Sequence, residues 1–563
     1  MNSAASSRVA EIRERHMARA EKFFRGAERL AIIEIVRSLD EAAFAFRVAP
    51  NAAELRIQDT FRNQLLLGAA SALRPLLERI GGTDGGVPWG PSSPARRQLT
   101  DEHLAACGRF AIVERALALQ RYGLATARFL SDDHLLVNVE NSEDDERERD
   151  AGAWLGTRER VQWTAGFQRL TQLKSKIASD IDSLVGVENG WFIRYDNSYD
   201  LVQYHRNIAE LSASGIAEAH AITASRPFGG RSFESWNGAS IDAYGRVLGH
   251  MAFATRLKAT HPHLDLRNLL TVYVRRDDLH DVWLEAGETA AGAEAVTDAM
   301  TLDADRALLA EREYELPVPY YVDFGRDFVL LPMFGGLMNA YSGVVEHLRR
   351  CHRQDWDRAV GDREGIFRNE LRLLLRPEAY EVPIRGYRIK RPNGTVISDI
   401  DAVVVERQSG TVALVQLKWP DVYGRSLRER DSRRKNLLAA SEWVALVHDW
   451  VGGRTSRDVA SALGLTGAGD AKPLIIVMSR HIARFSGEDG YDSRAQWVSW
   501  PEFVGLAEED SPLFERLAGS KMATAQRPKI RLASCIELEG LTVEFVQQGL
   551  AEETPPGSSD GFP

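Results

Sequence analysis

Apolar residues recur at helical spacing along most of the first 345 residues. They do so through Ala27, Leu30 and Ile33, with the three- to four-residue period of a helix that buries one face. Short strand patterns, at residues 270–274 and 320–331, interrupt this period only locally. We therefore predict a large, mainly helical N-terminal region.

Beyond residue 345 the pattern alternates between helix and strand. Its order is helix, extended stretch, two strands, helix and two further strands, over residues 362–375, 380–389, 395–406, 411–418, 427–451, 474–478 and 497–500. Strands that alternate with helices are typical of an α/β core. We expect a mixed sheet flanked by helices.

Length and turn-forming residues divide the chain further. At 563 residues the chain is too long for one hydrophobic core, and the Gly/Pro/Ser-rich residues 81–94 have the composition of a linker. We expect an α+β multidomain protein with four parts. These are an N-terminal helical segment, a mainly helical domain with short strands, the α/β core and a C-terminal extension with a disordered tail, at residues 1–80, 99–345, 346–515 and 516–563.

Composition narrows the class of protein. The three cysteines, Cys107, Cys351 and Cys535, are far apart in the sequence, which argues against a disulfide framework and a cysteine-based zinc site and predicts a reducing, cytoplasmic location. No window of about eighteen apolar residues occurs, so we expect no membrane partner. The net charge of −10 argues against a surface covered in nucleic-acid-binding charge, but a local basic groove is compatible with it.

The informative segment is residues 398–419, SDIDAVVVERQSGTVALVQLKW. Because side chains alternate along a strand, Asp399 and Asp401 share one face of the first strand, opposite Ile400 and its alternating apolar neighbours. Gln416 and Lys418 likewise share one face of the second strand. Polar side chains thus gather at one end of two strands that are otherwise apolar.

The turn between these strands fixes how they pair. If residues 407–410 close the hairpin symmetrically, Asp401 lies opposite Gln416 and Asp399 lies opposite Lys418. Directly opposed side chains have Cβ atoms about 4.5–5.5 Å apart. Two carboxylates, an amide oxygen and an ammonium would then converge on one patch.

This set of groups suits the cleavage of a phosphodiester. Mg²⁺ prefers oxygen ligands, and one or two carboxylates with a carbonyl oxygen hold it. Water bound to such a cation loses its proton far more readily than bulk water. A neighbouring lysine orients that water and offsets the charge of the phosphate.

At this point the segment resembles the PD-(D/E)XK, or restriction-endonuclease-like, nuclease superfamily. The matching residues are Asp401 and, on the next strand, Gln416-Leu417-Lys418. The resemblance implies that Asp401, the Gln416 side chain and the Leu417 carbonyl bind Mg²⁺ or Mn²⁺, and that Lys418 is the catalytic lysine. It also implies a glutamate from the preceding helix, which would be Glu370. The chain departs from the pattern at Gln416, where an acid is usual.

A basic helix follows the motif. Within residues 425–435, six Arg or Lys side chains stand against two acidic ones, in a protein that is acidic overall. Arg428, Arg433 and Arg434 are therefore candidate contacts to nucleic-acid phosphates beside the motif.

These residues predict a Mg²⁺- or Mn²⁺-dependent nuclease that acts on DNA in preference to RNA. The N-terminal region would recognise substrate, regulate cleavage, or bind a partner protein or a second copy of the chain. Two other interpretations stay open. One is an inactive nuclease-like fold that binds nucleic acid or protein, which the glutamine at position 416 favours. The other is a helical interaction scaffold in which the hairpin is incidental.

Overall fold

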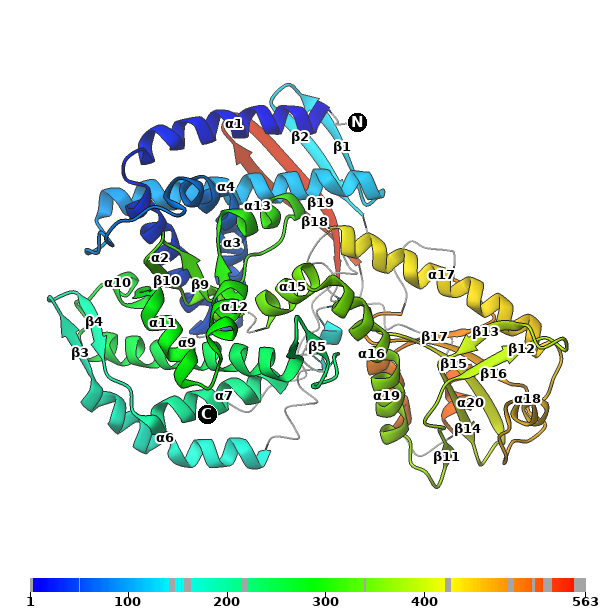
Figure 1. The fold of residues 1–563 in the computed structure, drawn as a ribbon. Helices are drawn as coiled ribbons and strands as arrows, with labels where there is room; N and C mark the ends of the chain where they lie inside the picture. The colour runs from blue at the N-terminus through cyan, green and yellow to red at the C-terminus, as the bar shows by residue number, and fades with distance from the viewer. Residues whose placement is uncertain are drawn as a thin grey trace.

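The computed structural model describes residues 4–550 except 50, 141–146, 149, 153, 156–163, 215–220, 339–340, 421–426, 484–490, 509–511 and 520–528. Figure 1 shows a large, mainly helical N-terminal lobe and a smaller C-terminal lobe that contains the strands β11 to β17. This arrangement confirms the predicted α+β class. In the described part of the chain, no helix combines the length and the apolar character that crossing a membrane requires.

Four long helices begin the N-terminal lobe: α1 (Ala4–Phe24), α2 (Glu28–Arg47), α3 (Ala52–Ile80) and α4 (Pro94–Ala118). Two of their starts follow from capping residues. Asn51 accepts a hydrogen bond from the backbone N–H of Glu54 at 2.9 Å, and Ser93 caps α4, whose first residue is a proline. The apolar side chains of α2 pack against those of α3 in one core.

The rest of this lobe places helices around a four-stranded sheet of order β7-β10-β9-β8. Three of its strands confirm those expected near residues 270–274 and 320–331: β7 (Val272–Arg275), β9 (Tyr321–Asp323) and β10 (Phe328–Leu331). The fourth, β8 (Thr301–Leu302), was not predicted. The surrounding helices are α6 (Thr164–Leu184), α7 (Tyr199–Ser214), α9 (Phe233–Thr260), α10 (Arg267–Leu270), α11 (Arg276–Glu285), α12 (Ala290–Met300), α13 (Ala304–Glu313), α14 (Phe334–Met338) and α15 (Ser342–Cys351). Short two-stranded ribbons are formed by β3 (Val185–Glu188) with β4 (Phe192–Tyr195) and by β5 (Pro227–Phe228) with β6 (Arg231–Ser232).

A buried carboxylate connects α2 to this sheet. Asp40 accepts hydrogen bonds from the Thr271 hydroxyl at 2.6 Å and from the backbone N–H groups of Met333 and Phe334 at 2.7 and 2.9 Å. Burial raises the pKa of Asp40 from 3.8 to about 7, although the three hydrogen bonds act in the opposite direction.

The raised pKa of Asp40 predicts a pH-dependent stability. The native state holds the Asp40 proton more tightly than the unfolded chain, so the free energy of unfolding falls as the pH rises from about 4 to about 7. Asp40→Asn keeps an oxygen for the backbone donors and cannot ionise, so we expect a smaller fall in the variant. Urea unfolding midpoints at pH 5 and pH 8 measure this. An equal fall in both proteins would contradict the expected role of Asp40.

The end of the described chain returns to the N-terminal lobe. Strands β18 (Lys529–Leu538) and β19 (Leu541–Leu550) form a hairpin, and β19 pairs in parallel with β2 (His134–Val139), next to β1 (Ala125–Ser131), in a sheet of order β1-β2-β19-β18. Figure 1 shows this sheet beside α1 and α4. The expected C-terminal extension, residues 516–563, therefore contains a hairpin that the sequence analysis did not predict. The expected disordered tail lies outside the described residues.

The C-terminal lobe is built on a mixed five-stranded sheet of order β11-β14-β15-β16-β17. The first two neighbouring pairs are antiparallel, whereas β15-β16 and β16-β17 are parallel. The strands are β11 (Tyr380–Glu381), β14 (Ala402–Glu406), β15 (Thr411–Lys418), β16 (Leu474–Ser479) and β17 (Gln496–Ser499). A separate ribbon joins β12 (Tyr387–Lys390) to β13 (Val396–Ile400).

Helices cover both faces of this sheet, as the sequence predicts. They are α16 (Arg353–Leu374), α17 (Leu427–Val451), α18 (Ser456–Leu463), α19 (Trp500–Ala507) and α20 (Leu513–Gly519). On one face, Ala402 and Val404 pack with Phe367 of α16 and Trp500 of α19. On the other, Val403 and its alternating neighbours pack with α17 and α18 side chains. This alternation explains why β14 and β15 are apolar at nearly every position.

A bend at Asp401 divides the single strand that was expected over residues 395–406. Strand β13 leaves the main sheet there, so that Asp399 pairs with Arg388 of β12. The predicted pairing of Asp399 with Lys418 is therefore wrong. Ile400 also lies in the core that contains Val403, not in the one that contains Ala402 as predicted, because the bend interrupts the alternation of side chains.

Candidate active site

The hairpin register that the sequence predicts is confirmed along β14 and β15. Glu406 pairs with Thr411 and Ala402 pairs with Val415. The turn between the strands ends at Gly410, whose φ of +65° favours glycine. Because the pairing is symmetric, the residue that precedes β14 reaches the end of β15, where the motif residues lie.

Asp401 is that residue. It is 8% exposed, and its Oδ2 accepts a hydrogen bond from the backbone N–H of Leu417 at 2.7 Å. Arg368 of α16 donates to the backbone carbonyl of Asp401. The carboxylate is thus fixed at the bend, directly beside the Gln416-Leu417-Lys418 segment.

Gln416 offers a buried oxygen that has no hydrogen-bond partner among the described residues. Its side chain is 9% exposed, and among the described residues nothing donates a hydrogen bond to its buried Oε1. A buried polar atom without a partner costs about 1–3 kcal/mol. Along β15, Leu417 packs in the core on one face of the sheet and Leu414 in the core on the other face. This agrees with the predicted alternation of side chains along the strand.

Lys418 ends the strand in a half-buried position. In the part of the chain that the structure describes, no carboxylate forms a direct ion pair with its ammonium. Burial lowers the pKa of Lys418, and the charges of Asp401, Asp399 and Glu364 act in the opposite direction. Three acidic groups therefore surround the ammonium without binding it directly.

The same electrostatics act on Asp401. Burial raises the pKa of its carboxyl from 3.8 to about 7, the negative charge of Glu364 adds to the rise, and the Leu417 hydrogen bond and Lys418 oppose it. A buried carboxyl beside other carboxylates is favoured as an anion when a cation binds there. The pair of opposite shifts at Asp401 and Lys418 is typical of functional sites.

The structure does not bring Glu370 to this group. Its carboxylate pairs with the guanidinium of Arg480, which is 2% exposed and lies over the Trp419 ring at 4.3 Å from the ring centroid. Glu364, six residues earlier on α16, is instead the helix carboxylate whose charge acts on Asp401 and Lys418.

A cavity of about 420 Å³ opens beside the group. Lys418 and Trp419 line it from the end of β15, Glu364 from α16, and Asn436 from α17. Lys418 therefore faces this cavity between the two long helices, whereas Asp401 and Gln416 are buried and are not among its lining residues. Arg428, Arg433 and Arg434 belong to the first turns of α17, and their side chains lie outside the described part of the structure.

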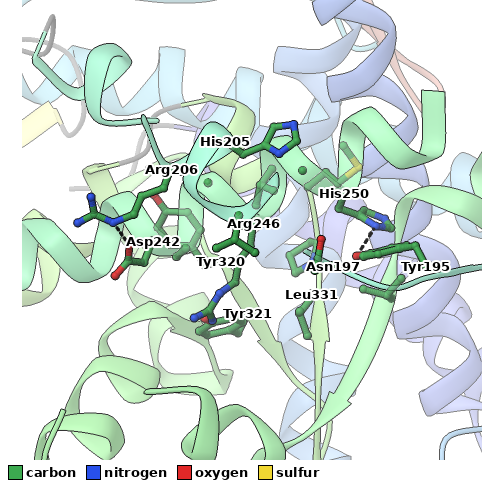
Figure 2. A pocket seen from close by; sticks show the side chains of 18 of the residues that line it. Tyr195, Asn197, His205, Arg206, Asp242, Arg246, His250, Tyr320, Tyr321 and Leu331 are labelled. Carbon is green, nitrogen blue, oxygen red and sulfur yellow. Dashed lines mark hydrogen bonds and ion pairs between the residues drawn. The ribbon is translucent and has the colours of Figure 1, made fainter. Parts of the chain in front are cut away.

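A second cavity, of about 440 Å³, lies in the N-terminal lobe (Figure 2). In it His250 hydrogen-bonds the Tyr195 hydroxyl at 3.0 Å, and Arg206 pairs with Asp242 at 2.7 Å. These groups satisfy one another, and none of the residues singled out by the sequence lines this cavity. It is therefore separate from the candidate site.

Comparisons with known proteins add no relative: no family model, no curated protein and no solved structure matches the chain.

Proposed function

We propose that the C-terminal lobe is a divalent-metal-dependent nuclease of the PD-(D/E)XK type that hydrolyses phosphodiester bonds in DNA. The observation that carries this proposal is the position of Asp401 beside the Gln416-Leu417-Lys418 segment, fixed by its hydrogen bond from the Leu417 N–H, with the charge of Lys418 acting on its carboxyl. The order α16, β14, β15, α17, β16 around a mixed sheet supports a restriction-endonuclease-like core.

The donor set fits Mg²⁺ or Mn²⁺. Asp401 supplies a buried carboxylate, and Gln416 supplies an amide oxygen to which no described residue donates a hydrogen bond. The resemblance adds the Leu417 carbonyl. All three are hard oxygen ligands, which these cations prefer over nitrogen or sulfur. When bound, the cation would polarise the phosphate and make its water more acidic.

The protein side chains have distinct tasks in this proposal. The Leu417 N–H holds the Asp401 carboxylate in one orientation. Lys418 places a partly desolvated ammonium, free of a direct ion pair among described residues, where it orients the attacking water and offsets phosphate charge. Burial strengthens that electrostatic effect, because water screens the interaction less.

DNA binding would extend beyond the small cavity. The first turns of α17, which carry Arg428, Arg433 and Arg434, begin next to the site. Their guanidinium groups suit phosphate contacts. The N-terminal lobe would then recognise the substrate, regulate cleavage or bind a protein partner.

The second candidate function is an inactive nuclease-like module that binds nucleic acid. The amide of Gln416 favours it, because an amide contributes no negative charge to a cation site. A cleavage assay separates the two. Full-length protein is incubated with linear, circular and single-stranded DNA and with RNA, in Mg²⁺, in Mn²⁺ or in EDTA.

Cleavage that requires the cation supports the nuclease. Binding of any of these substrates without cleavage in either cation would support the inactive module. The N-terminal lobe can impose a requirement for a particular substrate form, so the four forms are tested together.

Two substitutions on α16 test which helix carboxylate serves the site. We expect Glu364→Gln to lower the cleavage rate by roughly 10–100-fold, the loss typical of groups just outside the metal ligands. Glu370→Gln instead leaves the buried Arg480 guanidinium without its counter-charge and should cost about 1–3 kcal/mol of stability. Rates and urea midpoints of both variants decide between them, and the reverse pattern would restore Glu370 to the site.

A further inference from the structure

Three metal-ligating side chains meet in the N-terminal lobe, far from the proposed nuclease site in sequence. His16 of α1 and His103 and Cys107 of α4 each offer one ligand atom, and these atoms lie within 4.8 Å of one another. His103 and Cys107 are four residues apart and therefore share a helix face. His103 and Cys107 are buried, and His16 is half-buried.

The spacing of these atoms is close to that of ligands around one tetrahedral zinc ion. His16 Nε2 lies 3.0 Å from His103 Nδ1, and Cys107 Sγ lies 3.7–3.9 Å from the His103 ring nitrogens. Two nitrogen ligands of tetrahedral zinc are about 3.3 Å apart, and a nitrogen and a sulfur are about 3.6 Å apart. For these two pairs, shifts of a few tenths of an ångström would reach the separations of zinc ligands. The ligand atoms of the third pair, His16 and Cys107, lie within 4.8 Å of each other.

A fourth residue orients the first histidine. Glu539, in the turn between β18 and β19, contacts His16 Nδ1 through Oε1 at 2.8 Å. A carboxylate on the far nitrogen of a ligating histidine is the usual outer-shell partner, because it fixes the tautomer that leaves Nε2 free. Phe24 and Phe110 pack against the two imidazole rings, so the group has apolar walls.

We propose that His16, His103 and Cys107 form a binding site for a zinc-type divalent cation, with Glu539 orienting His16. Imidazole and thiolate ligands select such ions and disfavour Mg²⁺. The site is therefore chemically distinct from the proposed nuclease centre. Binding converts the Cys107 thiol to a thiolate, whose proton passes to solvent.

The wide separation of the three cysteines in the sequence argues against a cysteine-based zinc site. A site with one cysteine needs histidines from elsewhere, and the sequence does not show which ones lie near Cys107. Packing of α1 on α4 adds His16 to a single cysteine and its helical neighbour. Three protein ligands leave a fourth position for water or a small ligand, and a cavity of about 490 Å³ lies beside His103.

A bound ion would link three segments of the fold. The ion would hold α1 to α4, and Glu539 would connect both helices to the β18-β19 hairpin. Because the ion binds only the folded protein, its binding raises the melting temperature.

Co²⁺ titration of full-length protein, stripped with a chelator, tests the site. We expect the near-ultraviolet absorption of a thiolate-to-cobalt charge transfer to saturate at one Co²⁺ per chain, and Zn²⁺ to displace this ion. The oxygen ligands of the proposed nuclease centre cannot give this absorption. Cys107→Ser should lose this absorption, and His16→Gln should weaken Co²⁺ binding at least tenfold. Circular dichroism verifies that each variant is folded.

Two controls match these variants. The double variant Cys351→Ser/Cys535→Ser removes the two exposed thiols. The double variant His261→Ala/His263→Ala removes two histidines that contact each other outside the proposed site. Both should retain the absorption and the rise in melting temperature. The proposal fails if folded wild-type protein binds no Co²⁺ or Zn²⁺, or if Cys107→Ser binds as wild type does. The three side chains would then be linked by hydrogen bonds alone. Nuclease activity decides neither outcome.

Discussion

Lys418→Ala is expected to reduce Mg²⁺-dependent cleavage by about 10²–10⁴-fold, the contribution of one positioned proton-transfer or charge-stabilising group. The ammonium lies beside Asp401, Asp399 and Glu364 without a direct ion pair among the described residues. Its removal therefore breaks no salt bridge within the described part of the chain. We expect the substrate to remain bound, because the contacts of α17 are unchanged. Single-turnover cleavage rates and a binding assay in Ca²⁺ measure the two effects separately.

The matched control is Lys390→Ala, which removes an exposed lysine of the β12 ribbon. It should cleave at the wild-type rate. Wild-type cleavage by folded Lys418→Ala protein would show that Lys418 has no catalytic part and would favour the binding module.

Asp401→Asn is expected to abolish cleavage while the fold is retained. The amide oxygen can still accept the Leu417 N–H bond, which is 2.7 Å long in the native protein, but the charge that favours a cation is lost. The loss should exceed the roughly 10–100-fold effect of outer-shell groups. Because burial raises the pKa of Asp401 to about 7, the neutral amide avoids burying a charge at pH 8. The melting temperature there should equal or exceed that of wild type.

Asp470→Asn is the control for this substitution. Asp470 is exposed and lies near Gly410, at the opposite end of β15 from the site. It should leave cleavage unchanged. Full activity of Asp401→Asn, or a large loss of stability in metal-free buffer, would contradict the assignment of Asp401 as a cation ligand.

The hairpin was predictable because its determinants are local. A four-residue turn that ends in Gly410 sets the register, and the register places Asp401 next to Gln416. The two long helices α16 and α17 and the strands β14 to β17 followed from periodicity for the same reason, whereas the shorter helices α18, α19 and α20 were not predicted. The bend at Asp401 was not predictable, because β13 leaves the sheet to pair with β12, a partner that the local pattern does not specify.

Other features depend on contacts between distant segments. Whether Glu364 or Glu370 faces the site is decided by Arg480, which is 110 residues from Glu370 and pairs with it. The pairing of β19 with β2 joins segments about four hundred residues apart. The alternation of side chains within either strand does not identify the strand with which it pairs. The His16, His103 and Cys107 group depends on helix packing in the same way.

The proposed nuclease requires a divalent cation at the end of β14 and β15. Anomalous diffraction from crystals soaked in Mn²⁺ would locate this ion. We expect a peak about 2.1 Å from an Asp401 carboxylate oxygen and from Gln416 Oε1. A site without a peak, with Gln416 Oε1 hydrogen-bonded to protein, would contradict the claim.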